Sequence, residues 1–134
     1  MIALTVFSLR SAAADQPEDA MIENVQRIVF LGDSLTDGAA WPDWVVQTLQ
    51  THGHPQLVFA NAGICGDTIA LVKARATQDV LALHPDLVVL CIGVNDVSRG
   101  VPREQYLADM DEVIGRIRST GSKVLLLTPP ASSA

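Results

Sequence analysis

Several features that define common protein classes are scarce in this sequence of 134 residues. Two cysteines, Cys65 and Cys91, are too few for a disulfide scaffold or a structural zinc site. We interpret both as small buried residues, and we expect no metal and no cofactor. No apolar run approaches the roughly 20 residues of a membrane span. Lys and Arg number 9 against 15 acidic residues, and the missing basic cluster argues against a nucleic-acid partner.

The first residues form an ambiguous leader. An apolar run at 2–9 is followed by Ala12-Ala13-Ala14, the kind of small residues that a signal peptidase reads, but no basic residue precedes the run and Arg10 follows it. We assign residues 1–25 to a leader or damaged signal segment, with a disordered extension as the alternative, and residues 26–134 to one domain. The leader predicts an extracytoplasmic protein, secreted or periplasmic, with the cytoplasm as the alternative.

From residue 26 onward, apolar strands alternate with amphipathic helices. Strands are expected at 28–31, 57–60, 87–92 and 123–128. A first helix should have Pro42 in its first turn, carry Trp44, Val45, Thr48 and Leu49 at helical spacing, and stop at Gly53. Two more helices are expected, one capped by Asp67 or Thr68 and reaching Leu83, the other running from Pro102 to Gly121. This alternation indicates an α/β fold with a parallel sheet covered by helices on both faces.

Small and polar residues follow three of these strands. The segments are Gly32-Asp33-Ser34-Leu35, then Asn61-Ala62-Gly63, then Gly93-Val94-Asn95-Asp96. Each segment alone is more typical of an ordinary turn. Because the carboxyl ends of parallel strands meet at one edge of a sheet, the three together would gather a hydroxyl, a glycine N–H and a carboxamide. A nucleophile beside donors that can bind an oxyanion is the combination that acyl transfer requires, so the three segments together predict an acyl-transfer site.

In this order and spacing, the three motifs resemble the GDSL, or SGNH, hydrolases over roughly residues 26–130. The resemblance implies a flavodoxin-like three-layer α/β/α sandwich with strand order 2-1-3-4-5. It also implies that Ser34 is the nucleophile. The oxyanion hole would then consist of the Ser34 N–H, the Gly63 N–H and the side-chain amide of Asn95.

The general base of such a site is not apparent in the sequence. The family's Asp-x-x-His motif is absent, and the chain stops after the fourth strand, before the fifth strand that the family fold would add. His52, His54 and His84 are expected at the amino ends of strands, roughly 15 Å or more from Ser34. A general base must lie within about 3 Å of the hydroxyl, so none of them qualifies.

Three acids lie closer to the nucleophile in sequence or in the expected fold. Ordinary carboxylates are poor bases for a serine hydroxyl, so we interpret Asp33, Asp37 and Asp96 as groups that order the loops. The sequence therefore predicts a serine ester hydrolase for small acyl esters, such as acetylated carbohydrates or short-chain lipid esters, with low or no activity in a truncated chain.

Two alternatives stay open, and both keep the same fold. One is a non-catalytic binding or assembly module, and the other is a nucleotide or phosphate binder that uses the Ser34 loop as an anion nest. Without a fifth strand, residues 123–128 would form an apolar edge through which two chains could pair.

Overall fold

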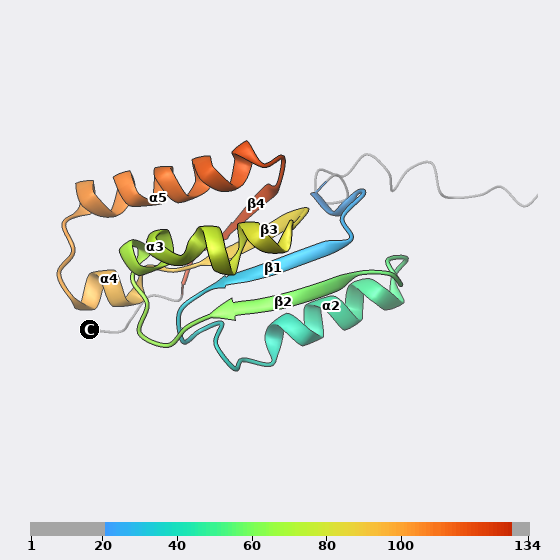
Figure 1. The fold of residues 1–134 in the computed structure, drawn as a ribbon. Coiled ribbons are helices and arrows are strands. Elements are labelled where there is room, and N and C mark those ends of the chain that lie inside the picture. The colour runs from blue at the N-terminus through green and yellow to red at the C-terminus, as the bar shows by residue number, and fades with distance from the viewer. Residues whose placement is uncertain (1–20, 130–134) are drawn as a thin grey trace, which may run out of the picture.

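The computed structural model describes residues 21–129, which form a four-stranded sheet with helices on both faces (Figure 1). The strands are β1 Arg27–Gly32, β2 Val58–Gly63, β3 Leu87–Cys91 and β4 Lys123–Leu127. All neighbours are parallel and the order is β2-β1-β3-β4, which confirms the α/β fold and matches the first four strands of the expected order. Gly32 is in register with both Gly63 and Cys91, so three strands end at the same level.

Most of the predicted leader, residues 1–20, lies outside the described residues, and that part stays a prediction. The last residues assigned to the leader contact the domain itself. Val25 is buried, and Met21 and Ile22 pack against the same core cluster. In the described part of the chain, no helix combines the length and apolarity that crossing a bilayer would require.

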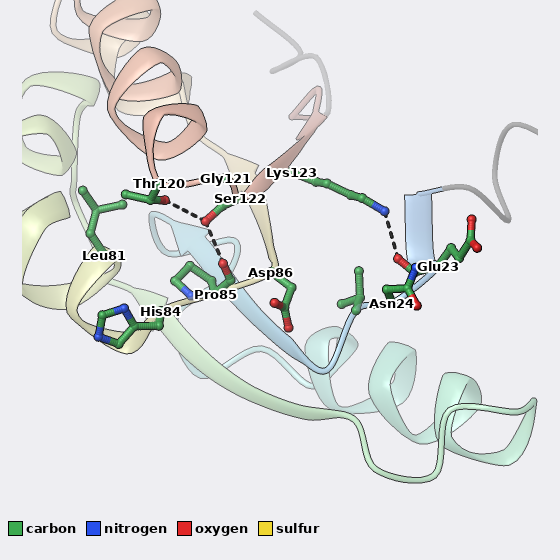
Figure 2. A pocket seen from close by; sticks show the side chains of 11 residues that line it. Glu23, Asn24, Leu81, His84, Pro85, Asp86, Thr120, Gly121, Ser122 and Lys123 are labelled. Carbon is green, nitrogen blue, oxygen red and sulfur yellow. Dashed lines mark hydrogen bonds between the residues drawn. The ribbon is translucent and has the colours of Figure 1, made fainter.

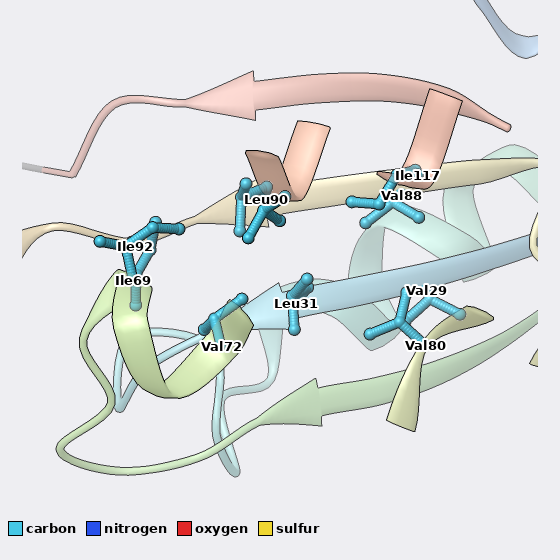
Figure 3. Close-up of a cluster of buried hydrophobic side chains, with 10 residues drawn as sticks. Val29, Leu31, Ile69, Val72, Val80, Val88, Leu90, Ile92 and Ile117 are labelled. Atoms are coloured by element: carbon cyan, nitrogen blue, oxygen red, sulfur yellow. The ribbon is translucent and has the colours of Figure 1, made fainter. Parts of the chain in front are cut away.

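Alternate residues of β1 and β3 supply two separate cores. One core lies under α3 Ile69–Asp79 and α5 Arg103–Ser119, where Val29 and Leu31 of β1 meet helix residues such as Val72 and Ile117 (Figure 3). The other lies under α2 Trp41–Thr51, on the opposite face of the sheet, and is centred on Phe30. This two-sided burial explains why the strand sequences read as uninterrupted apolar runs.

The residues that the sequence places at helical spacing on the first helix do not all face the core. Trp44 is 66% exposed and Val45 is also exposed, whereas Pro42 and Val46 are buried and Leu49 packs against the core. The buried stripe therefore follows positions i, i+4 and i+7 from Pro42. Because the helix is apolar on more than one side, hydropathy alone could not select the stripe that faces the sheet.

Two further elements differ from the expected ones. Residues 93–96, expected as a turn, instead lead into a short helix, α4 Val94–Ser98. The helix expected to reach Leu83 ends at Asp79, and a 3-10 helix, η2 Leu81–Leu83, follows it. His84 then adopts a left-handed conformation with φ of 50°, which turns the chain into β3.

Candidate active site at the carboxyl edge of the sheet

The turn that carries Ser34 begins at a glycine with no room for a side chain. A Cβ at Gly32 would lie 2.3 Å from the carbonyl oxygen of Cys91 and 2.6 Å from Thr36 Oγ1. The chain can therefore leave β1 against the end of β3 only if residue 32 is glycine.

Asp33 fixes the shape of this turn. Its carbonyl accepts the N–H groups of Thr36 and Asp37 at 3.0 and 2.9 Å. Its carboxylate oxygen Oδ1 accepts the N–H of Leu35 at 2.9 Å. Ser34 lies between these anchored residues, exposed to solvent, and its hydroxyl and N–H have no hydrogen-bond partner among the described residues. The turn is thus held rigid while its serine remains available.

The end of β2 and the loop after it are bonded to the same turn at three points. The Ile64 N–H donates to the carbonyl of Gly32 at 3.0 Å. The other two bonds run from the Cys65 N–H to Asp37 Oδ2 at 2.9 Å and from Asn61 Nδ2 to the Thr36 carbonyl at 2.7 Å. The first two sequence motifs therefore lie side by side, as their positions after neighbouring strands predict.

Gly63 does not present the free donor that the sequence predicts. Its N–H donates to Asn61 Oδ1 at 2.9 Å, within the end of β2. A Cβ at this position would lie 2.4 Å from the Asp37 nitrogen. Glycine is required here by close packing against the Ser34 turn, and the oxyanion role predicted for the Gly63 N–H would require this hydrogen bond to break.

Gly66, three residues further on, has the properties that Gly63 lacks. Its N–H has no acceptor within the described part of the chain, and its φ of 84° favours glycine. The nearest atom to a Cβ placed there would be Arg99 Nη2 at 3.7 Å, so no backbone crowds the position. Arg99 also donates to the Gly66 carbonyl at 2.9 Å. The sequence offered one signal, a second glycine in the same loop, but no means of choosing between the two.

Asn95 lies next to this peptide. It occupies the first turn of α4, and its Nδ2 donates to the Asp67 carbonyl at 2.8 Å. The second N–H of the amide has no acceptor among residues 21–129. Within residues 21–129, the carboxyl edge thus combines a serine hydroxyl that has no partner with N–H groups of Ser34, Gly66 and Asn95 that have no acceptor.

The three acids near Ser34 each accept a backbone N–H of these loops. Asp33 and Asp37 bind Leu35 and Cys65, and Asp96 accepts the Ile69 N–H, the first of α3, at 3.1 and 3.2 Å. Burial raises the pKa of Asp96 above its ordinary value, and this effect outweighs the lowering by that hydrogen bond.

Comparison with known proteins agrees with this geometry. Residues 30–134 match the model of the GDSL-like Lipase/Acylhydrolase family. The chain belongs to this family. It is 30% identical over 133 residues to an arylesterase from Vibrio mimicus, covering 95% of this chain and 62% of the relative. It is 31% identical over 131 residues to an acetylxylan esterase from Geobacillus stearothermophilus, covering 78% of this chain and 59% of the relative.

A solved structure agrees as well. An acetyl xylan esterase from Geobacillus stearothermophilus superposes with a TM-score of 0.72 at 28% identity, covering 78% of this chain and 60% of the esterase. This GDSL-family chain thus spans about 60% of the length of the relatives it matches.

The histidines of the GDSL chain lie away from Ser34. His52 follows α2, where its Nδ1 lies 2.7 Å from the Thr48 carbonyl oxygen, and His54 precedes β2. His84 precedes β3. All three are at the amino ends of strands, so no histidine of the described residues can serve as the base.

Among the cavities of the described residues, two lie at opposite edges of the sheet. The larger, about 400 Å³, lies at the amino edge between Glu23, His84 and Lys123, where the Ser122 hydroxyl donates to the Pro85 carbonyl (Figure 2). Because this cavity lies at the edge of the sheet opposite Ser34, its lining residues cannot take part in a reaction at Ser34. The smaller, about 310 Å³, lies at the carboxyl edge beside Asn95, and its wall is mostly apolar, formed by Ile92, Gly93, Asp96, Val97, Val101, Arg103, Tyr106 and Pro129.

Proposed function

We propose that this chain carries the nucleophile and the oxyanion-binding groups of a serine ester hydrolase. The Ser34 hydroxyl attacks the acyl carbonyl carbon, and the negative oxygen that forms accepts hydrogen bonds from the N–H groups of Ser34, Gly66 and Asn95. One observation carries the proposal. At a single sheet edge, an exposed serine hydroxyl and three N–H groups, one each from Ser34, Gly66 and the Asn95 amide, have no acceptor among the described residues, while the loops that carry them are bonded in place.

The reaction needs a proton acceptor. As the Ser34 oxygen bonds to carbon, its proton passes to a base, the alcohol leaves with a proton, and water then releases the acid and restores the serine. No imidazole of the described residues stands at this edge. We therefore propose that the base comes from outside the described residues, and that the described chain alone reacts slowly.

The substrate that we propose is an ester of a small acyl group such as acetyl. The names of the relatives support this class, because one is an arylesterase and another an acetylxylan esterase. The apolar cavity beside Asn95 is suited to an apolar part of either the acid or the alcohol.

A second candidate function rests on the position of the histidines. With none at the carboxyl edge, the same pocket could bind an ester or acid without turning it over, as a binding or assembly module. The two functions differ in whether Ser34 reacts once a base is supplied.

Added imidazole supplies that base and separates the two functions. Hydrolysis of p-nitrophenyl acetate is followed with increasing imidazole for the full chain, for Ser34→Ala and for Ser98→Ala, an exposed serine on α4. The rate of hydrolysis by imidazole alone is subtracted. We then expect imidazole to raise the hydrolysis rate of the full chain and of Ser98→Ala about tenfold, a small part of what a positioned base provides. Ser34→Ala should gain nothing. Equal imidazole dependence in all three proteins would favour the binding module.

A further inference from the structure

Arg75 of α3 reaches the edge of the sheet that carries the candidate site. Its side chain is only 14% exposed, and its Nε lies 2.7 Å from Oδ2 of Asp67, which is 8% exposed. Its Nη2 donates to the Ala62 carbonyl at 2.7 Å and to the Gly32 carbonyl at 3.4 Å. A single guanidinium thus contacts the ends of β1 and β2 and the loop between β2 and α3.

The packing of the helix does not explain this charge. The buried face of α3 consists of Ile69, Val72 and Ala76, which meet the apolar core. A buried guanidinium is costly unless all its donors are satisfied, and here the partners are two carboxylates, Asp67 and Asp79, and the strand-end carbonyls. The planar fork of arginine suits several acceptors at once, which the single ammonium of lysine cannot match.

These contacts surround the segment that presents Gly66. Ala62 precedes the loop and Asp67 follows Gly66 directly, while the Gly32 carbonyl also accepts the Ile64 N–H at 3.0 Å. Movement of this guanidinium would therefore remove one of the ties between the loop and the strand that leads to Ser34 and leave the backbone bonds of Ile64 and Cys65 to hold it.

We infer that Arg75 is a positioning residue that holds the Gly66 N–H in place relative to Ser34. It touches neither the nucleophile nor the carbonyl under attack, and it acts through the loop at 64–67. This inference rests on the proposed function of the edge as an oxyanion-binding site. Displacing a donor by a fraction of an ångström weakens transition-state binding more than substrate binding. Loss of the Arg75 contacts should therefore lower kcat and leave KM unchanged.

The test compares Arg75→Lys and Arg75→Met with Arg116→Met in the full chain. Arg116 is a matched control, because it also binds a carboxylate, Glu112, and a carbonyl, that of Lys73, but between α3 and α5. In the imidazole-dependent hydrolysis of p-nitrophenyl acetate, we expect Arg75→Lys to lower kcat about tenfold with KM unchanged. Arg116→Met should leave both constants as in the unmodified chain. If Arg75→Met fails to fold, Arg75→Lys still tests the inference, because its ammonium keeps a positive charge beside Asp67.

Amide hydrogen exchange provides a second readout that does not depend on catalysis. The Ile64, Cys65 and Asp67 N–H groups are hydrogen-bonded, and in Arg75→Lys they should exchange faster than in Arg116→Met. If the unmodified chain shows no Ser34-dependent reaction, the proposed function fails while the exchange result still tests the role of Arg75. Unchanged kcat in a folded Arg75→Lys, or unchanged loop exchange, would overturn the inference.

Discussion

Asp96 is an acid buried at the base of the candidate site, and its surroundings set its charge. Its carboxylate accepts the Ile69 N–H, the acid Asp33 and the hydroxyl of Tyr106 lie close enough to interact, and the Arg99 guanidinium opposes them. Burial is the largest influence and raises the pKa of Asp96. The folded chain therefore holds this proton more tightly than the unfolded chain does.

Asp96→Asn should remove a pH dependence of stability. With a folded pKa above the unfolded one, Asp96 stabilises the fold below the ordinary carboxyl pKa, and that contribution falls as pH rises to the folded pKa. Asparagine still offers an oxygen to Ile69 but does not titrate. Urea unfolding is measured between about pH 3 and 7. As pH rises, the free energy of unfolding of Asp96→Asn should increase relative to that of the unmodified chain.

The control for Asp96→Asn is Asp111→Asn, which removes one charge from an exposed position on α5. Parallel free-energy curves for Asp96→Asn and the unmodified chain over the whole range would contradict the raised pKa of Asp96.

Single residues also show how far sequence reasoning reaches. Ser34 and Asn95 could be placed because each directly follows a strand of a parallel sheet. Gly63 ends β2 and Gly66 lies in the loop after it, and the two differ in contacts that the sequence does not show. The Gly63 N–H is bonded to Asn61, whereas Gly66 has open space beside Arg99. The role of Arg75 could not be predicted, because it depends on bonds to main-chain carbonyls of distant strands as well as on its ion pairs.

At the scale of elements, β4 differs from the strand beside it. All five residues of β3 are buried, whereas no residue of β4 is. Val124 packs under α5 and Leu127 faces the α2 side, but Leu125 is 37% and Leu126 is 51% exposed. Since β4 is the last strand in the order β2-β1-β3-β4, its outer main-chain groups and part of both faces are uncovered by the described residues.

We expect two copies of the chain to pair through this edge. Sizing with light scattering should show a dimer fraction that grows with protein concentration. Leu126→Lys should shift the chain to monomer, because a lysine on an edge strand opposes strand pairing. Leu107→Lys is the control, since Leu107 is 46% exposed on α5 and away from the edge. A monomer at high concentration, or equal dissociation by both variants, would contradict pairing through β4.

Elements were predictable where two features agreed. The three long helices and four strands follow from apolar periodicity together with proline and glycine at their ends. The inner face of α2 and the existence of α4 were not predictable. Trp44 is apolar but points to solvent, and α4 is only 5 residues long, with Asp96 oriented by a bond to another helix.

At the scale of the whole molecule, the sheet separates two edges of different character. The amino edge carries the histidines and a polar cavity, and the carboxyl edge carries Ser34, the Gly66 loop and Asn95. Membership of the GDSL family follows from the motifs and the match over residues 30–134. The alternation of strand and helix made this division predictable, because every parallel strand must return to the same edge.

The most direct test of the account is the site of acyl transfer. The chain is treated with p-nitrophenyl acetate and imidazole, and the reaction is quenched in acid. The protein is then digested, and the masses of its peptides are measured by mass spectrometry. Cys65 is an exposed thiol in the neighbouring loop, so Cys65→Ser is analysed in parallel to remove the competing nucleophile. We predict one added acetyl group on Ser34 in both proteins, and none at that peptide in Ser34→Ala. Acetylation confined to Cys65 or to lysines, with Ser34 unmodified, would contradict the assignment of Ser34 as the nucleophile.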